Sequence, residues 1–321
     1  MRVITAADLE ARLDPLALVE KLRSAFRGGV QVPLRQHYDV PSLTGSQNTL
    51  LIMPAWQIDR HVGIKIVTVA PDNGSRSLPT ILGAYLLLDA KTGAPIALVD
   101  GPALTARRTA AASALASSYL ARPDADRLLM VGTGTLAPFL IAAHGAVSPV
   151  RQVLIWGRDP RKAEKLAKTL RKTLADHRWA AARKPTFAAT IDLPGACAGA
   201  SIISVATLSA EPLIRGEWLM PGAHVDLVGA FKPSMRESDA EVMRRGRVFV
   251  DTREGALNEA GDIVQAINTG DLRQDDIAAD LFELCRGEKA GRRFHNQITV
   301  FKSVGTALED LAAAQLAVRY A

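Results

Sequence analysis

The chain has 321 residues, of which 48% are hydrophobic and 22% charged, so its length and composition fit two globular domains and argue against long disorder. Its formal net charge of +6 comes from 39 Lys and Arg scattered among 33 Asp and Glu, and only 5% of the residues are aromatic. Without a basic block or stacking side chains, nucleic acid is not the expected ligand, and the mild positive bias favours small anions.

Cysteine and histidine offer no metal centre or disulfide framework. The chain has two cysteines, Cys197 and Cys285, and none of its six histidines shows metal-ligand spacing. The N-terminus, MRVITAADLEARL, lacks an apolar signal core, and no stretch reaches the roughly 18 apolar residues of a membrane span. We therefore expect a cytoplasmic protein with no bound metal and no membrane contact.

The first third of the chain combines helices with a sheet. Residues 5 to 27 have helical spacing behind a Thr cap and predict one or two short helices. Residues 49 to 100 contain short β-rich runs separated by Pro, Gly, Asn or Asp, which predict an antiparallel or mixed sheet. The Ala-rich run from Leu104 to Leu120 predicts a helix with Thr105 as its N-cap.

After residue 126, strand-like and helix-like segments alternate. The apolar runs RLLMV, VLIWG, SIISVAT, HVDLVGA and RVFVD are separated by helical or looped segments. Because parallel strands need crossover connections, this alternation predicts an α/β fold with a Rossmann-type doubly wound parallel sheet, next to a mixed α+β domain. The last helix, within SVGTALEDLAAAQLAVRYA, is expected to pack on the first domain.

A glycine-rich turn follows the first of these strands. The pattern Gly132-x-Gly134-x-x-Ala137 includes Thr133, Thr135 and Leu136, and it is the Ala variant of the dinucleotide-binding fingerprint. Gly132 would allow the tight turn, Gly134 would let a pyrophosphate approach the backbone, and Ala137 would let helix and strand pack closely. A structural turn is the alternative, but the flanking strand and helix favour a nucleotide.

The end of the second strand indicates which nucleotide. NAD enzymes usually place an acid there for the ribose 2′-hydroxyl, whereas this chain has Gly157 and Arg158, followed by Arg161 and Lys162. Arg158 can pair with a 2′-phosphate, so the sequence favours NADPH over NADH, which stays possible. We interpret Asp159 as the cap of the helix that begins at Pro160.

Cations inside or beside apolar runs suggest the substrate. These are Arg35 in VPLRQHYDV, Lys65 in VGIKIVTVA and Arg108 in LTARRTAAA. A lysine midway along a half-buried strand must pair, reach solvent or serve a site. Arg35 and Arg108 taken singly could be surface residues, but together the three cations could hold the carboxylate of an amino, imino or keto acid.

The chain resembles the ornithine cyclodeaminase and mu-crystallin family over nearly its whole length. The resemblance is carried by LLIMPAW, GIKIVTVAPDN, SLPTILGAYLLLDAKTGAPIALVDG, LTARRTAAASALA, VGTGTLA, VFVDTREGALNEAGDI and ITVFKSVGTALEDLAAA. It implies a homodimer in which residues 1–115 and 301–321 form a substrate-binding and dimerisation domain and residues 116–300 form an NAD(P)-binding Rossmann domain.

The resemblance also implies roles for particular residues. Arg35, Lys65 and Arg108 match positions that hold the substrate carboxylate, and Thr135 and Leu136 match the pyrophosphate turn. The positions expected near the nicotinamide or its ribose are Thr80, Thr207, Ser303 and Val304, and Arg108 and Ala206 are also expected to bind the cofactor.

Two departures from the family pattern bear on the reaction. Ornithine cyclodeaminases carry an acid after a Gly-Gly pair, where this chain has Ala230, and a second acid before the Met-Pro pair, where it has Leu51. Without them a cationic ornithine tail would be desolvated without a partner, at a cost of several kcal/mol. Asp226 and Glu237 are the neighbouring acids that could in principle substitute.

An apolar pocket end suits a compact carboxylate without a free amine, and the residues are similar to those of cyclic ketimine reductases. The expected reaction is hydride transfer to Δ1-pyrroline-2-carboxylate, Δ1-piperideine-2-carboxylate or both, giving proline or pipecolate, with Lys65 and Arg108 as the catalytic residues. The proton source stays open between the imine itself, Lys65 and water. The alternatives are an ornithine cyclodeaminase or amino acid dehydrogenase, and a non-catalytic NADPH-binding protein.

Overall fold

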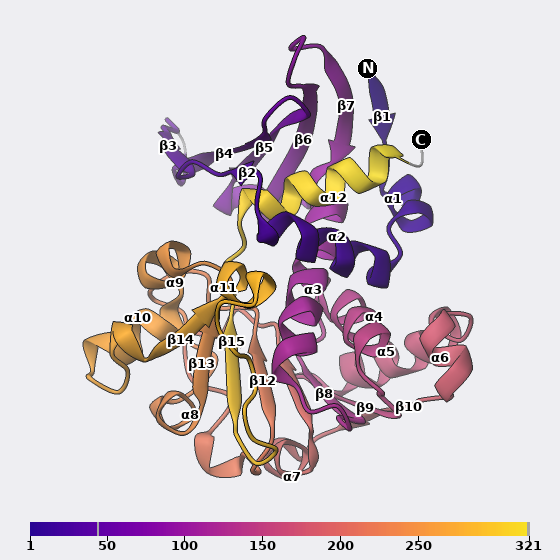
Figure 1. The fold of residues 1–321 in the computed structure, drawn as a ribbon, viewed down its shortest axis with the longest axis vertical. Coiled ribbons are helices and arrows are strands. Elements are labelled where there is room, and N and C mark those ends of the chain that lie inside the picture. Colours follow the sequence, from indigo (N-terminus) through magenta and orange to yellow (C-terminus); the bar gives the residue numbers. More distant parts are fainter. Residues whose placement is uncertain (44, 320–321) are drawn as a thin grey trace. The chain divides into compact units, whose positions relative to one another are not determined.

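The computed structural model describes residues 1–43 and 45–319. The chain divides into two compact units, one formed by residues 1–108 and 306–321 and the other by residues 109–305 (Figure 1). No helix in the described part of the chain combines the length and apolar character needed to cross a membrane.

The first unit contains a seven-stranded mixed sheet in the order β1-β7-β6-β5-β4-β2, with β3 also paired to β4. Strands β4 to β7 form an antiparallel meander, and β1 pairs in parallel with β7. The mixed sheet predicted for residues 49 to 100 is therefore confirmed. Its strands are β1 (Arg2–Ile4), β2 (Val30–Gln31), β3 (Gln36–Val40), β4 (Asn48–Gln57), β5 (His61–Val69), β6 (Ile81–Asp89) and β7 (Pro95–Asp100).

Helices from both ends of the chain pack in this unit. The predicted N-terminal helices are α1 (Ala6–Arg12) and α2 (Pro15–Arg27), and Thr5 caps α1 by accepting from the backbone N–H of Asp8. The C-terminal helix α12 (Ala307–Arg319) packs against α2 and across β4, β5 and β6, as the sequence led us to expect (Figure 1). A 3₁₀ turn, η1 (Pro71–Arg76), lies between β5 and β6.

The predicted N-cap of the Ala-rich helix is wrong. Helix α3 (Gly101–Leu120) begins a turn earlier than expected, and Thr105 lies inside it. Asp100 accepts a hydrogen bond from the backbone N–H of Ala103 at 2.8 Å and so performs the capping. Pro102 fits the first turn because its missing N–H would have no helical partner there. Asp-Gly-Pro thus starts the helix before its Ala-rich part.

The second unit contains the predicted parallel sheet, with eight strands in the order β10-β9-β8-β11-β12-β15-β13-β14. Strand β8 lies between β9 and β11, so the chain winds in opposite directions on its two sides. This is the topological switch point at which doubly wound sheets bind nucleotides. The strands are β8 (Arg127–Val131), β9 (Gln152–Trp156), β10 (Thr186–Thr190), β11 (Ile202–Val205), β12 (His224–Leu227), β13 (Arg247–Val250), β14 (Ile277–Asp280) and β15 (Thr299–Lys302).

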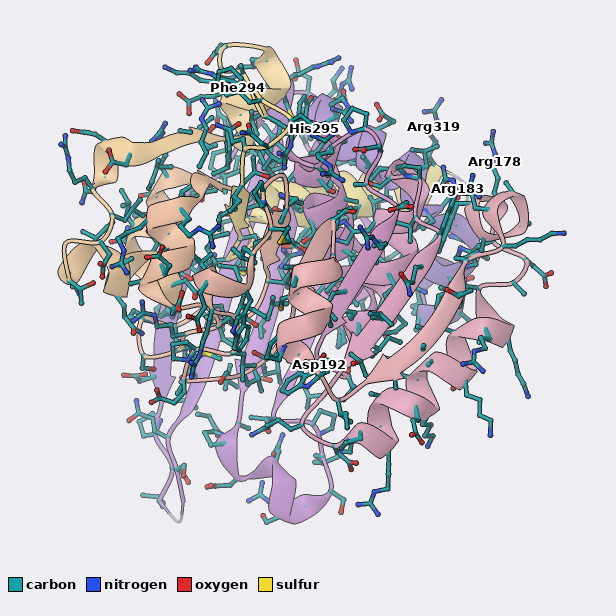
Figure 2. All side chains as sticks on the ribbon, turned by 90° about the horizontal axis from the view of Figure 1, so that it is seen from below. Arg178, Arg183, Asp192, Phe294, His295 and Arg319 are labelled. Atoms are coloured by element: carbon teal, nitrogen blue, oxygen red, sulfur yellow. The ribbon has the colours of Figure 1, made fainter. Side chains whose placement is uncertain are left out.

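Short helices connect these strands, and polar side chains fix several of their ends. Asp192 caps α7 through the backbone N–H of Gly195 at 3.0 Å, and Arg183 of α6 donates to the carbonyl oxygens of Gly145 and Ser148. Both side chains are labelled in Figure 2. The connecting elements are α4 (Ala137–Val147), α5 (Pro160–Thr173), α6 (Arg178–Arg183), α7 (Leu193–Gly199), η2 (Gly216–Trp218), α8 (Ala240–Arg245), α9 (Arg253–Glu259), α10 (Gly261–Asn268), η3 (Gln274–Asp276) and α11 (Leu281–Arg286).

Candidate functional site

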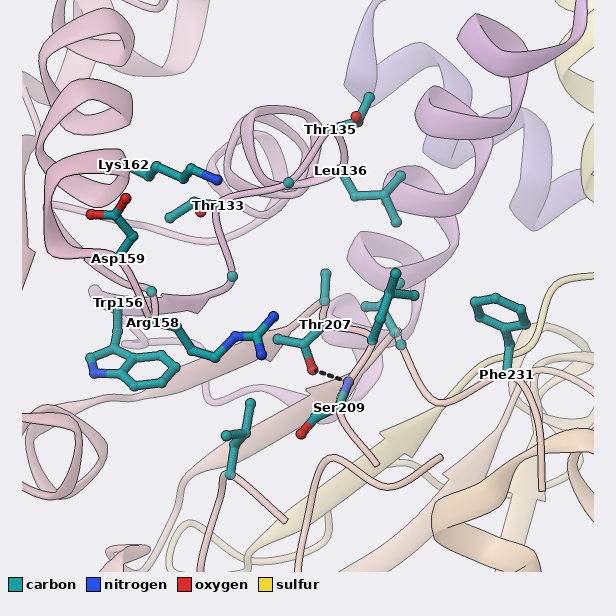
Figure 3. Close-up of a pocket in the computed structure, with 18 residues that line it drawn as sticks. Thr133, Thr135, Leu136, Trp156, Arg158, Asp159, Lys162, Thr207, Ser209 and Phe231 are labelled. Atoms are coloured by element: carbon teal, nitrogen blue, oxygen red, sulfur yellow. Dashed lines mark hydrogen bonds between the residues drawn. The ribbon is translucent and has the colours of Figure 1, made fainter. Parts of the chain in front are cut away.

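A pocket of about 780 Å³ opens at the switch point of the second unit, beyond the ends of β8, β9, β11 and β12 (Figure 3). This volume is in the range of small-molecule sites. Most residues predicted to bind the cofactor line it: Gly132, Thr133, Gly134, Thr135, Leu136, Gly157, Arg158, Lys162, Ala206 and Thr207. The sequence did not identify the other lining residues, which are Trp156, Asp159, Leu208, Ser209, Leu213, Val228, Gly229 and Phe231.

The glycine turn has the geometry of a phosphate cradle. Gly132 has φ of +119°, and a Cβ there would lie 2.5 Å from the carbonyl oxygen of Ala206, so only glycine fits. A Cβ on Gly134 would meet nothing within 4 Å, so the backbone there faces open space. The open backbone at Gly134 fits a dinucleotide pyrophosphate. The start of α4 adds less, because the backbone N–H of Ala137 donates to the carbonyl oxygen of Gly134 at 3.1 Å and Pro138 has no N–H.

The end of β9 gives the pocket a basic rim. Arg158 is exposed and, in the view of Figure 3, extends from β9 into the pocket; Lys162 also lines it. Asp159 caps α5 as predicted, with its Oδ1 accepting from the backbone N–H of Arg161 at 3.0 Å, and it lines the pocket as well. The Arg161 side chain is 92% exposed and lines a separate hollow on α5 instead.

Buried ionic groups support the wall of the pocket that contains Thr207. Glu237 Oε1 accepts from the backbone N–H of Thr207 at 2.7 Å and from its hydroxyl at 2.8 Å. Lys302 donates to the carbonyl oxygen of Gly229, and its Nζ lies 3.7 Å from Asp262 and 4.0 Å from Glu237. Burial raises the pKa of Glu237 to about 8 against the opposing effect of Lys302. Sequence patterns alone do not identify this group, because its members lie far apart in the chain.

Neither acid considered as a substitute for the missing carboxylates faces the pocket. Asp226 is fully buried in β12 between the Ser204 hydroxyl at 2.7 Å and His144 Nε2 at 3.1 Å. Glu237 is also fully buried, with Oε1 engaged by Thr207. Ala230 is buried with φ of +48°, and Leu51 is half-buried in β4. These four residues therefore supply no exposed carboxylate.

The first unit contains a buried cluster that joins two of the predicted carboxylate-binding cations. Lys65 of β5 donates to Asp310 Oδ1 at 3.2 Å, and Arg108 of α3 donates to the same oxygen at 3.0 Å and to Glu309 Oε2 at 2.6 Å. Burial lowers the pKa of Lys65 to about 8, an effect that Asp310 opposes. Sequence analysis identified both cations as candidate site residues, but it identified neither of their carboxylate partners on α12.

The remaining predicted residues do not join that cluster or line the pocket. Arg35 is half-exposed just before β3, and Thr80 is exposed just before β6. Ser303 and Val304 follow β15 in the second unit, where the backbone N–H of Val304 donates to Asp251 Oδ2 at 2.8 Å. Their expected contacts with a nicotinamide therefore stay predictions.

Comparison with known proteins identifies the family. The model of the ornithine cyclodeaminase/mu-crystallin family matches residues 2–319. The chain belongs to this family. The resemblance inferred from the sequence is thus confirmed.

Similar proteins include one without an assigned activity and two named as reductases. The chain is 45% identical to an uncharacterized protein of Schizosaccharomyces pombe, covering 96% of this chain and 94% of that protein. It is 39% identical to the Δ1-pyrroline-2-carboxylate reductase of Paracoccus denitrificans, covering 98% and 96%. Among solved structures, the Δ1-pyrroline-2-carboxylate reductase of Thermococcus litoralis in complex with NADH and L-proline matches with a TM-score of 0.88 and 33% identity, covering 99% of this chain and 97% of that one.

Proposed function

We propose that this protein is an NADPH-preferring reductase of cyclic imino acids, acting on Δ1-pyrroline-2-carboxylate, Δ1-piperideine-2-carboxylate or both. The observation that carries the proposal is the buried pair of Lys65 and Arg108, which hold their charged ends around one oxygen of Asp310. Such a pair suits a substrate carboxylate, and the nucleotide pocket suits a hydride-donating cofactor. The names of the Paracoccus and Thermococcus relatives point to the same reaction.

The chain's residues divide the work between binding and orientation. The turn at Gly132 to Leu136 would hold the pyrophosphate, and Thr207, fixed by Glu237, forms a wall of the pocket. Lys65 and Arg108 hold the substrate carboxylate and so orient C2 for reduction. A bound NADPH supplies the hydride from C4 of its nicotinamide. Orientation of C2 is the contribution that these cations make to the rate.

The alternatives fit the residues less well. An ornithine cyclodeaminase would need a carboxylate for the side-chain ammonium, and Leu51 and Ala230 offer none. A non-catalytic binding protein would not need two buried cations in its substrate region, because keeping charges out of water is costly. An amino acid dehydrogenase differs mainly in using an open-chain substrate, so the choice of substrate decides between it and a cyclic imine reductase.

Initial rates distinguish these functions. We expect oxidation of NADPH with at least one of the two cyclic imines, slower oxidation of NADH, and no ammonia from ornithine. If neither imine supports oxidation of either cofactor, the proposed reaction is wrong. Ammonia release from ornithine would favour the cyclodeaminase, and reduction of NADP⁺ with an open-chain amino acid would favour the dehydrogenase.

Arg158→Ala should weaken NADPH binding at least about tenfold while changing NADH binding less than about twofold, because charge-assisted hydrogen bonds to a phosphate contribute about 1.5–3 kcal/mol. Titration of protein fluorescence with each cofactor measures both constants. Arg161→Ala is the matched control, since it removes the same charge three residues later, outside the pocket. Equal losses for the two cofactors would mean that Arg158 does not contact the 2′-phosphate.

We further infer the domain roles and the homodimer that the family resemblance implies. Residues 1–115 with 301–321 would bind substrate and form the dimer, and residues 116–300 would bind NADPH. Light scattering should then give twice the chain mass of 34.3 kDa. A mass equal to that of one chain would exclude the dimer.

A further inference from the structure

The cluster that holds Lys65 and Arg108 has no net charge. Lys65 and Arg108 are formally cationic side chains, and their ion-pair partners Asp310 and Glu309 of α12 are formally anionic, with one charge each. Tyr85 of β6 lies opposite Lys65 in the sheet, and burial raises the pKa of its hydroxyl well above the usual value. Tyr85 is therefore neutral, and it leaves the charge balance unchanged.

The four charged groups are arranged in two levels of exposure. The side chains of Lys65 and Arg108 keep 6% and 7% of their surface exposed, whereas Asp310 and Glu309 keep none. The two cations are therefore the members of the cluster that a ligand could reach, and the two acids are not. Asp310 Oδ1 lies within 3.2 Å of both cationic groups, so it acts on any ligand that they hold.

A neutral cluster treats ligands of different charge differently. A carboxylate without a positive group would add an uncompensated negative charge beside two buried acids, where a low effective dielectric makes charge interactions strong. A zwitterion, with its carboxylate next to a protonated nitrogen, adds no net charge.

We propose that Asp310, supported by Glu309, is a specificity-determining residue that makes the cluster select zwitterionic ligands over monoanions of the same shape. This proposal rests on the proposed function, in which Lys65 and Arg108 hold the substrate carboxylate. The preferred ligands are then cyclic iminium carboxylates and their secondary ammonium products, and 2-oxo acids are disfavoured. The same preference brings the imine to the site in its protonated form, the better hydride acceptor. Asp310 acts through Lys65 and Arg108 and does not touch the ligand.

Two ligands that differ only in their nitrogen test this selection. L-Proline is a zwitterion at pH 7, and cyclopentanecarboxylate has the same ring size and a net charge of −1. Dissociation constants for both are measured by calorimetry with saturating NADPH, in the wild-type protein and in Asp310→Asn. We expect the wild type to bind proline more tightly, and we expect Asp310→Asn to shift the ratio of the two constants at least about tenfold toward cyclopentanecarboxylate.

A matched control separates this effect from a general change of charge. Glu10→Gln also removes one negative charge from the first unit, from a side chain that is 80% exposed and pairs with Arg107, the neighbour of Arg108. Its ratio of constants should equal that of the wild type. An Asp310→Asn ratio within about twofold of the wild-type ratio would overturn the proposal, as would a wild type that binds neither ligand or prefers the monoanion.

The test remains decisive if Asp310→Asn does not fold. Glu309→Gln removes one charge from the same cluster and should shift the ratio in the same direction, and the wild-type preference can be measured in any case. Binding needs no turnover, so the result is independent of the reaction. A protein that prefers proline but reduces neither imine would contradict the proposed function and keep this inference.

Discussion

Lys65→Met is expected to lower kcat/KM for the cyclic imine by at least about 30-fold, because losing one member of a buried charge pair that holds a ligand costs about 2–5 kcal/mol. Methionine fills a similar volume without the charge. Asp310 keeps its hydrogen bond from Arg108 Nε at 3.0 Å, so the variant should remain folded. The glycine turn lies in the other unit, so NADPH should bind with unchanged affinity. Steady-state kinetics and a cofactor titration measure the two quantities.

The pH dependence of ligand binding provides a second measurement of the same role. The pKa of Lys65 is lowered to about 8, chiefly by burial, so the side chain is charged below that pH and neutral above it. The affinity for cyclopentanecarboxylate, which has no group titrating in this range, should therefore fall as the pH rises through about 8. Lys65→Met should lose this dependence. A wild-type affinity that is constant from pH 7 to 9 would contradict a carboxylate-binding role for Lys65.

Substitutions of two neighbouring arginines are compared with Lys65→Met: Arg108 belongs to the same cluster, and Arg107→Met is the control. Arg108→Met leaves both Asp310 and Glu309 buried without that partner, and we expect it to lower the free energy of unfolding by about 3–5 kcal/mol as well as to abolish activity. Arg107→Met removes the neighbouring arginine, which pairs with the exposed Glu10 at 3.0 Å and donates to the carbonyl oxygen of Ala103, and we expect it to leave kcat/KM nearly unchanged. Similar activity losses in Lys65→Met and Arg107→Met would mean that Lys65 has no specific role.

Sequence reasoning succeeded where one local segment determines the answer. The spacing Gly132-x-Gly134 sits between a strand and a helix, so its conformation depends on neighbours along the chain. The Asp159-Pro160 cap is local in the same way. Lys65 could be recognised because a charged side chain in an apolar strand is unusual. The parallel sheet could be predicted because each strand-like or helix-like segment was recognisable from its own residues, and their alternation implies crossover connections.

The partners of those residues could not be predicted, because they are distant in sequence. Lys65 and Asp310 are 245 residues apart, and Glu309 and Asp310 lie in an Ala-rich helix where acids usually mark a solvated face. Glu237 and Lys302, which support the wall of the nucleotide pocket, are also distant in sequence, so their pairing could not be predicted. The edge strands β1 and β14 were also missed, since three or four residues give too short a pattern and pairing with a neighbour determines their conformation.

The glycine turn gives the other large expected effect, and its two glycines should behave differently. Gly132→Ala places a Cβ 2.5 Å from the carbonyl oxygen of Ala206 at a φ of +119°. We expect it to lower the free energy of unfolding by at least about 2 kcal/mol, since strained backbone and overpacking cost about 1–3 kcal/mol each. It should also abolish NADPH binding, because β8 and β11 would have to separate at the switch point. Urea unfolding and a cofactor titration measure both effects.

Gly134→Ala separates the nucleotide function of the turn from its structural role. The added methyl group would meet nothing within 4 Å, and the backbone at Gly134 does not require a positive φ, so stability should change by less than about 1 kcal/mol. If a pyrophosphate lies against this backbone, as the motif predicts, the methyl group occupies its space and NADPH binding should weaken at least about tenfold. Unchanged binding in Gly134→Ala, with lost stability in Gly132→Ala, would show that the turn joins β8 to α4 without holding the pyrophosphate there. The pair of substitutions therefore distinguishes a phosphate cradle from a structural turn, the two interpretations that the sequence alone leaves open.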